Sequence, residues 1–182
     1  MTAAVVLCAG GSTRFGDQPK LLAPFRGRPL AAWALDAAGA ASFDEVIVVI
    51  GSADLSAVLG SQIIVENTRW TSGLASSLRT GVAAAEQRGH EVIVVGLGDQ
   101  PLVPASAWRA VGGATSPIAV ATFGGHRSPP TRLARVVWPL LPTSGDVGAR
   151  ELIQARPDLV CEVACEGDRL DIDTVQELDK WG

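Results

Sequence analysis

The chain has 182 residues, a length that can bury a hydrophobic core and that predicts one domain over residues 1–182. Hydrophobic residues make up 47% and charged residues 19%, which excludes a disordered chain, and the formal net charge of −4 excludes a generally basic face for nucleic acid. The three cysteines are too few, and odd in number, for a disulfide framework, and no apolar stretch is long enough to span a membrane. These properties predict a cytoplasmic enzyme that binds neither nucleic acid nor membrane.

A short apolar run near the N-terminus ends in a loop of small residues. Gly10 and Gly11 let the backbone turn tightly and leave N–H groups uncovered, and such groups bind anionic oxygens. Arg14 and Lys20 add positive charge, so the loop has what a nucleoside triphosphate requires. Gly11 and Gly16 have the spacing of a P-loop, but Asp17 and Gln18 stand where that motif requires Lys and Ser or Thr. The loop does not supply the dinucleotide fingerprint either, and an ordinary strand-to-helix turn is the alternative.

Further continuous apolar runs predict the buried strands of a parallel sheet. These strands are predicted at residues 45–50, 62–66, 91–98, 118–123 and 159–164. Helices are predicted at residues 30–41, 104–112, 133–141 and 175–181, with a short one within 51–60 and another opening at 145–150. A further helix is predicted to start in the second half of residues 67–81 and to run to about residue 88. Residues 124–131 are predicted to form a loop. This alternation predicts an α/β fold in three α/β/α layers, with a mainly parallel, twisted sheet of about seven strands.

Several carboxylates stand where such a fold binds ligands. Asp99 lies just past the carboxyl end of a predicted core strand, so it is a candidate Mg²⁺ ligand, with helix capping as the alternative. Asp171 and Asp173 alternate with Ile172; if Ile172 enters the core, both carboxylates face the other way. The alternative is that Asp173 or Thr174 caps the last helix.

Candidate contacts for a second, anionic substrate lie further along the chain. His126 and Arg127 belong to the predicted loop at 124–131, which is either such a contact or a surface turn. Arg150 stands in the first turn of a predicted helix, where its charge opposes the helix dipole. This position has two explanations: Arg150 contacts a ligand, or it pairs with Asp146, the predicted N-cap of that helix.

Five blocks, in order along nearly the whole chain, resemble the MobA-like NTP transferase family. The first is Leu-Cys-Ala-Gly-Gly-Ser-Thr-Arg-Phe-Gly at residues 7–16, followed by Lys20; the family has Ala at the position of Cys8. Another is Gly-Asp-Gln-Pro at 98–101, where the family more often has Asp-Met-Pro. The remaining blocks lie at residues 67–81, 145–150 and 171–174. The chain is most similar to the molybdenum cofactor cytidylyltransferase (MocA-like) branch of this family. It has Ala9 at the third position of the first block, where the guanylyl branch usually has Gly.

The resemblance implies a Rossmann-like nucleotide-diphospho-sugar transferase fold and a Mg²⁺-dependent reaction. In that reaction the phosphate of molybdopterin attacks the α-phosphorus of CTP, CMP is transferred, and pyrophosphate leaves. The implied catalytic residues are Arg14, Lys20 and Asp99. The implied nucleotide-binding residues are Leu7, Ala9, Gly10, Gly11, Lys20, Gly73, Ser77 and Asp99, and the implied metal ligands are Asp99, Asp171 and Asp173. The implied acceptor-binding residues are Arg127, Pro130 and Arg150, with Trp70 either beside them or in the core.

The same resemblance implies the partners. They are an NTP, a phosphorylated acceptor (molybdopterin in this branch), and a molybdoenzyme apoprotein or its chaperone as recipient of the product. The chain itself is expected to be a monomer or a weak dimer. Two alternatives stay open: a relative that uses GTP or another acceptor such as phospholactate or a sugar phosphate, and a cofactor-binding chaperone without catalysis. The presence of Arg14, Lys20 and Asp99 argues against the chaperone.

Overall fold

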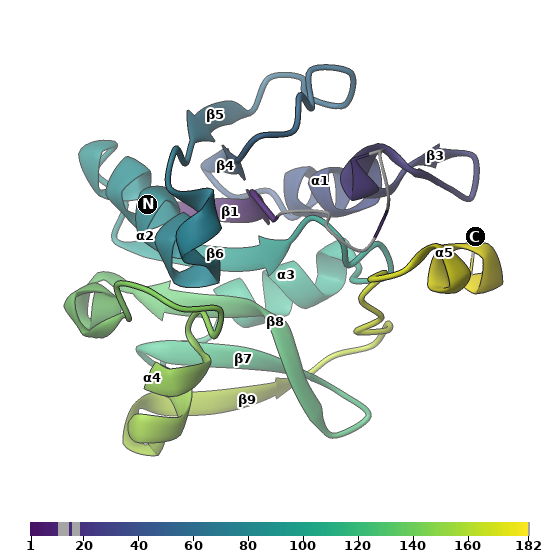
Figure 1. Ribbon diagram of the computed structural model, residues 1–182. Coiled ribbons are helices and arrows are strands. Elements are labelled where there is room, and N and C mark those ends of the chain that lie inside the picture. The colour runs from purple at the N-terminus through teal and green to yellow at the C-terminus, as the bar shows by residue number, and fades with distance from the viewer. Residues whose placement is uncertain (11–14, 16–18, 182) are drawn as a thin grey trace.

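A seven-stranded sheet with the order β5-β4-β1-β6-β8-β7-β9 forms the centre of the molecule (Figure 1). The computed structural model describes residues 1–10, 15 and 19–181. Among the described strands, β8 is antiparallel to its neighbours β6 and β7, and the other pairings of this sheet are parallel. The strands are β1 (Thr2–Cys8), β4 (Glu45–Ile50), β5 (Ile63–Glu66), β6 (Val92–Leu97), β7 (Ile118–Phe123), β8 (His126–Ala134) and β9 (Val160–Ala164). Two short strands, β2 (Pro24–Phe25) and β3 (Arg28–Pro29), pair separately.

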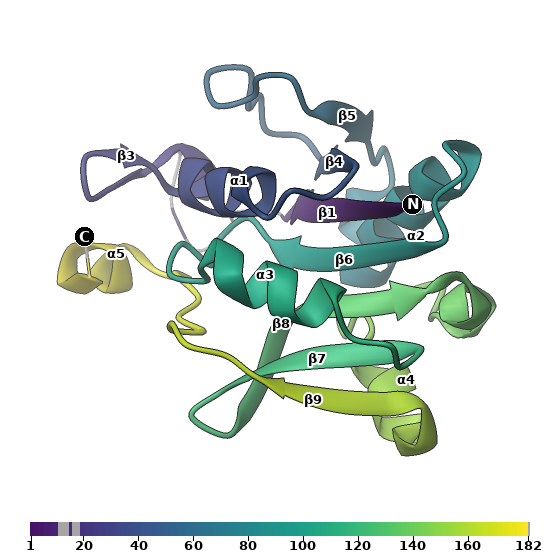
Figure 2. The ribbon, with the colours of Figure 1, turned by 180° about the vertical axis from the view of Figure 1, so that it is seen from behind.

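Helices cover both faces of the sheet, which confirms the predicted three layers. The α-helices are α1 (Leu30–Ala40), α2 (Leu74–Gln87), α3 (Ala105–Gly112), α4 (Arg150–Ala155) and α5 (Val175–Trp181), and 3₁₀ turns lie at Lys20–Leu22, Trp70–Ser72, Arg135–Leu140 and Pro157–Leu159. Apolar side chains of α1 and α3 share one core cluster with the sheet, and those of α2 and α4 share a second cluster on the opposite face. Figure 2 shows α1 and α3 in front of the sheet.

Close packing of these layers requires glycine at particular positions. A Cβ on Gly81 of α2 would lie 2.6 Å from Val5 Cγ1 on β1, and a Cβ on Gly96 of β6 would lie 2.4 Å from Trp108 Cζ2 on α3. Both glycines let a helix approach the sheet more closely than a side chain would permit.

The segment at 124–131 is not the predicted loop. It forms a two-residue turn, Gly124–Gly125, with φ of 56° and 81°, followed by strand β8. Two prolines in succession argue against a central strand, because proline cannot donate to the ladder. Here they occupy a register irregularity: Ser128 pairs with Ala121 and Thr131 with Val120, so residues 129 and 130 lie between the paired positions. The predicted helix at 133–141 is likewise the end of β8 and a 3₁₀ turn.

Two further local predictions were wrong, and one, the capping of the last helix, is confirmed. The described residues 51–60 form turns and no helix, and Asp146 does not cap α4, because Ala149 occupies its N-cap. The capping prediction for the last helix is confirmed: Glu177 N donates to Thr174 Oγ1 (3.2 Å), and Thr174 N donates to the Glu177 carboxylate (3.0 Å). Ile172 is fully buried, which is the condition on which both neighbouring aspartates were expected to face the other way. No helix in the described part of the chain is long and apolar enough to cross a membrane.

Candidate active site

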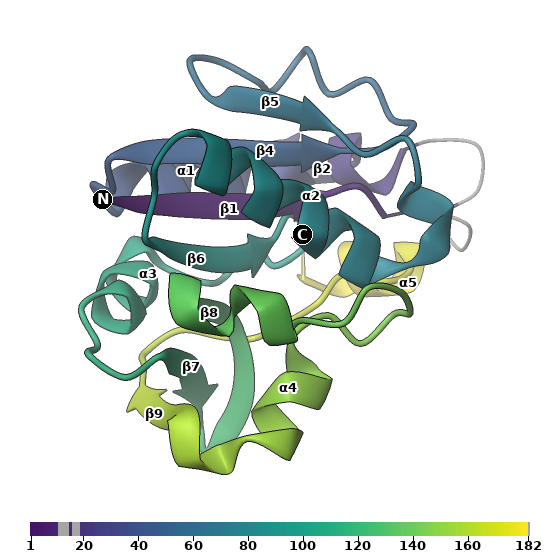
Figure 3. The same cartoon turned by 90° about the vertical axis from the view of Figure 1, so that its left-hand side faces the viewer.

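A cavity of about 390 Å³ lies at the carboxyl ends of β1 and β6. Figure 3 shows the arrowheads of β4, β5 and β6 pointing toward this edge of the sheet, on the side where α5 also lies. Parallel strands leave such a crevice beyond their carboxyl ends, where α/β folds bind ligands. The predicted nucleotide-binding residues that line the cavity are Leu7, Ala9, Gly10, Lys20, Gly73, Ser77 and Asp99. Gly11 and Arg14 lie outside the described residues.

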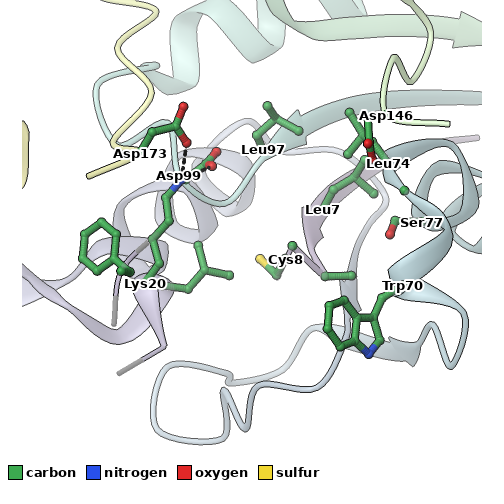
Figure 4. A pocket seen from close by; sticks show the side chains of 15 residues that line it. Leu7, Cys8, Lys20, Trp70, Leu74, Ser77, Leu97, Asp99, Asp146 and Asp173 are labelled. Carbon is green, nitrogen blue, oxygen red and sulfur yellow. Dashed lines mark hydrogen bonds and ion pairs between the residues drawn. The ribbon is translucent and has the colours of Figure 1, made fainter. Parts of the chain in front are cut away.

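One end of this cavity holds Lys20 between two carboxylates (Figure 4). Lys20 Nζ lies 2.7 Å from Asp99 Oδ2 and 2.7 Å from Asp173 Oδ1, and its side chain is 12% exposed. Burial lowers the pKa of Lys20, but the charges and hydrogen bonds of Asp99 and Asp173 outweigh burial, so this pKa is raised. The lysine therefore stays a cation.

Two contacts of Ile172 hold the C-terminal segment, residues 171–173, at this end of the cavity. Ile172 N donates to the carbonyl oxygen of Asp99 (3.2 Å), and the Ile172 side chain packs with Phe15, Phe25 and Leu178. These contacts place residues 171–173 beside the turn that follows β6. Local patterning cannot show this contact, because it joins segments far apart in the sequence.

The carboxylates fit a divalent cation that is completed by substrate. Asp99 Oδ1 is buried and has no hydrogen-bond partner within the described structure, while Asp173 stands on the other side of Lys20. Over residues 1–10, 15 and 19–181, no group of three or more His, Cys, Asp or Glu side chains is placed to hold a metal ion. Mg²⁺ commonly takes one or two carboxylates together with substrate phosphates and water, so Asp99 and Asp173 supply what such a site needs from protein.

Asp171, the third predicted metal ligand, lines a different cavity from this pair. Asp171 lines a second cavity, whereas Asp99 and Asp173 line the first. Partial burial, together with the negative charges of Asp99 and Asp173, raises the pKa of Asp171 to about 6, although a hydrogen bond from Gln100 and the charge of Lys20 act in the opposite direction. Asp171 is thus close enough to the metal candidates to sense their charge.

The other end of the first cavity is formed by the start of α2. Figure 4 shows Trp70, Ser77 and Asp146 at that end, opposite Lys20. Buried Asn67 fixes this segment, because its Nδ2 donates to Ser76 Oγ (2.8 Å) and Ser77 Oγ (3.0 Å).

Gly73 allows Asp146 to lie against the start of α2, at this end of the first cavity. Gly73 has φ of 96°, and a Cβ there would lie 2.5 Å from Asp146 Oδ1. Asp146 was predicted as a helix cap or as a partner of Arg150, and not as a site residue; its place within the block at 145–150 is the signal that could have identified it. Trp70, considered for the acceptor side, lines the first cavity and not the second.

The second cavity, of about 500 Å³, adjoins the first and shares four of its lining residues. The shared residues are Leu7, Leu74, Leu97 and Asp146. Arg127 and Arg150 line it as predicted acceptor residues, whereas Pro130 is buried and its neighbour Pro129 lines the wall. Arg169 also lines it, and no sequence signal pointed to this residue.

Comparison with known proteins gives one family across the chain. The MobA-like NTP transferase domain matches residues 4–160. The chain is 34% identical to nicotine blue oxidoreductase of Paenarthrobacter nicotinovorans and 32% identical to purine catabolism protein PucB of Bacillus subtilis (strain 168). Each alignment covers 96% of this chain and 93% of the relative.

Solved structures agree with the fold. Rv0371c from Mycobacterium tuberculosis H37Rv superposes with a TM-score of 0.83 at 31% identity, covering 98% of this chain and 96% of that one. A structure of Rv0371C in complex with manganese superposes with a TM-score of 0.79 at 30% identity, covering 99% and 97%.

Proposed function

Because the chain belongs to the MobA-like NTP transferase family, we propose that it transfers CMP from CTP to the phosphate of molybdopterin and releases pyrophosphate. The observation that carries this proposal is the placement of Lys20 between Asp99 and Asp173, at one end of a cavity that opens toward a second, arginine-lined cavity. Two adjoining cavities suit a reaction between two substrates, and the charged cluster suits a triphosphate with its metal.

The residues of the two cavities suit an in-line displacement without a covalent enzyme intermediate. An oxygen of the acceptor phosphate forms a bond to the α-phosphorus, and the bond from that phosphorus to the bridging oxygen of the β-phosphate breaks. The electron pair leaves with pyrophosphate. Lys20 neutralises the charge that grows on this leaving group, and Arg127 and Arg150 hold the acceptor phosphate in the second cavity.

A divalent cation, when bound by Asp99 and Asp173, would supply further neutralisation of the triphosphate. That a structure of Rv0371C contains manganese supports a metal in this family, and we propose Mg²⁺ as the ion for this chain. The base would lie between Trp70 and the start of α2, where Gly73 and Ser77 contact it.

The test is pyrophosphate release by the purified protein with Mg²⁺, molybdopterin and each of the four common NTPs in turn. We expect release with CTP. Release with GTP instead would replace the nucleotide in this proposal, and no release with any NTP would contradict it. The change in melting temperature caused by each NTP with Mg²⁺ gives an independent ranking of the nucleotides.

A second candidate function is reduction of a conjugated heterocycle. It is favoured by one observation, the 34% identity with a protein named nicotine blue oxidoreductase over nearly the whole chain. The same cavity that suits an NTP would then take a nicotinamide nucleotide. Oxidation of NADH or NADPH in the presence of a heterocyclic acceptor, with no pyrophosphate from any NTP, would favour this candidate over nucleotidyl transfer.

A further inference from the structure

Gln100 and Asp171 form a hydrogen-bonded unit in the wall of the second cavity. Gln100 is 2% exposed, and its Nε2 donates to Ser128 Oγ (3.1 Å) on β8. The same amide hydrogen-bonds to the Asp171 carboxyl group. A single buried amide therefore joins the central sheet to the C-terminal segment and orients the Asp171 carboxylate.

This carboxylate is placed differently from the metal candidates two residues away. Lys20 donates to Asp99 and Asp173, whereas Asp171 lines only the second cavity. Ile172 is fully buried between the two aspartates, and two residues of extended chain span roughly 7 Å. The segment thus delivers one carboxylate to each cavity.

The charges around Asp171 indicate what part of a ligand it meets. Arg150 and Arg169 line the same cavity, and within the described residues their side chains make no hydrogen bond or ion pair, whereas Arg127 pairs with Glu162 (2.7 Å). A phosphate is drawn to the arginines and repelled by a carboxylate. Asp171 therefore faces a part of the acceptor other than its phosphate.

A carboxylate accepts hydrogen bonds and donates none, and its two oxygens can accept a pair of parallel N–H groups. One bond from Gln100 leaves lone pairs on both oxygens available. The matching ligand chemistry is an edge that presents adjacent N–H donors, such as an amino group beside a ring N–H.

We propose that Asp171, positioned by Gln100, is a specificity-determining residue that accepts hydrogen bonds from the amino and ring N–H edge of a heterocycle in the second substrate. This inference rests on the proposed function, which it deepens by assigning the non-phosphate end of the acceptor to a side chain. Asp171 is then an acceptor contact and not a metal ligand, and Gln100 is a positioning residue.

The test compares two fluorescent probes without nucleotide or metal: pterin (2-amino-4-oxopteridine) and lumazine (2,4-dioxopteridine), which has oxygen in place of the amino group. Dissociation constants come from the quenching of probe fluorescence. We expect the unaltered protein to bind pterin about tenfold or more tightly than lumazine, because hydrogen bonds to a charged group are lost with lumazine. Equal binding, or no binding of either probe at its solubility limit, would overturn the proposal.

Variants separate recognition from structure. Asp171→Asn is expected to bring the ratio of the two dissociation constants close to one, and Gln100→Met, which keeps a similar volume but cannot donate, is expected to reduce it. Melting temperatures verify that both variants fold. A ratio unchanged in Asp171→Asn would also overturn the proposal.

A second readout distinguishes acceptor contact from metal ligation. Mn²⁺ affinity in the presence of CTP, followed by electron paramagnetic resonance, should fall in Asp173→Asn and stay unchanged in Asp171→Asn. Equal losses would assign Asp171 to the metal instead. Because the probe assay needs no turnover, it remains decisive if no NTP yields pyrophosphate, and CTP-dependent turnover without probe discrimination would reject this inference alone.

Discussion

Lys20 Nζ lies 2.7 Å from Asp173 Oδ1, although 153 residues separate them in the sequence. The lysine opens the 3₁₀ turn after the N-terminal loop, and the aspartate precedes the last helix. Their contact closes one end of the first cavity and gives the cluster its alternating charges, with Asp99 on the other side of the ammonium. Three predictions concern this cavity, and a fourth concerns the opposite edge of the sheet.

Lys20→Ala is expected to lower kcat by roughly 10²–10³-fold, because it removes a preorganised cation from the leaving pyrophosphate. Nucleotide affinity, measured by titration with CTP and Mg²⁺, should fall much less than kcat. Lys180→Ala is the matched control, since Lys180 is the other lysine of the chain and lies over the Trp181 ring on the surface. A kcat unchanged in Lys20→Ala would remove the lysine from the reaction.

Asp99→Ala is expected to abolish turnover while the fold is retained, because the carboxylate with the unpartnered Oδ1 is lost. Circular dichroism and the melting temperature check the fold, and Mn²⁺ affinity should fall in the same variant. Removal of the metal from the unaltered protein with EDTA should likewise stop turnover, and adding Mg²⁺ should restore it. The control is Asp158→Ala, which alters an exposed carboxylate. Near-normal activity of Asp99→Ala would show that the metal is held elsewhere.

Gly73→Ala is expected to destabilise the start of α2 by about 1–3 kcal/mol, because its φ of 96° disfavours a side chain and the new Cβ would press on Asp146. Urea unfolding measures the loss, and weaker CTP binding should accompany it. Gly39→Ala on α1 is the control: nothing lies within 4 Å of its added Cβ, so we expect a gain of about 0.5–1 kcal/mol. Equal effects of the two substitutions would contradict the packing described here.

Glu45, at the opposite edge of the sheet from the cavity, is expected to make the free energy of unfolding depend on pH. Hydrogen bonds from Arg88 and from buried His90 lower the pKa of Glu45 from 4.5 to about 2. A depressed native pKa stabilises the fold above the unfolded value, and this contribution disappears as the pH falls from 4.5 through 2. Glu45→Gln should therefore reduce the free energy of unfolding at pH 7, and the difference from the unaltered protein should shrink toward pH 2.

Urea unfolding at pH 7, 4 and 3 measures this difference. Glu151→Gln, an exposed carboxylate at the start of α4, serves as the control and should show no such trend. A difference for Glu45→Gln that stays constant over this range would mean that the carboxylate charge is not what stabilises the edge.

The sequence alone determined the family, the layered α/β fold and most of the groups in the first cavity. Strands such as β4 and β7 and helices such as α5 have the predicted bounds, since continuous apolar runs and capping residues act through near neighbours. Lys20 and Asp99 were recognised as candidate residues because the motifs that carry them are local in the sequence.

Only the tertiary structure decided the rest. Pro129 and Pro130 argue against a strand until pairing with β7 shows that they occupy an irregular position in β8. With Ile172 in the core, strict alternation would place the Asp171 and Asp173 carboxylates on one side, yet the two line different cavities. The physical reason is that strand register and the position of the C-terminal segment depend on contacts between residues far apart in the sequence. Local sequence patterns carry no information about such contacts.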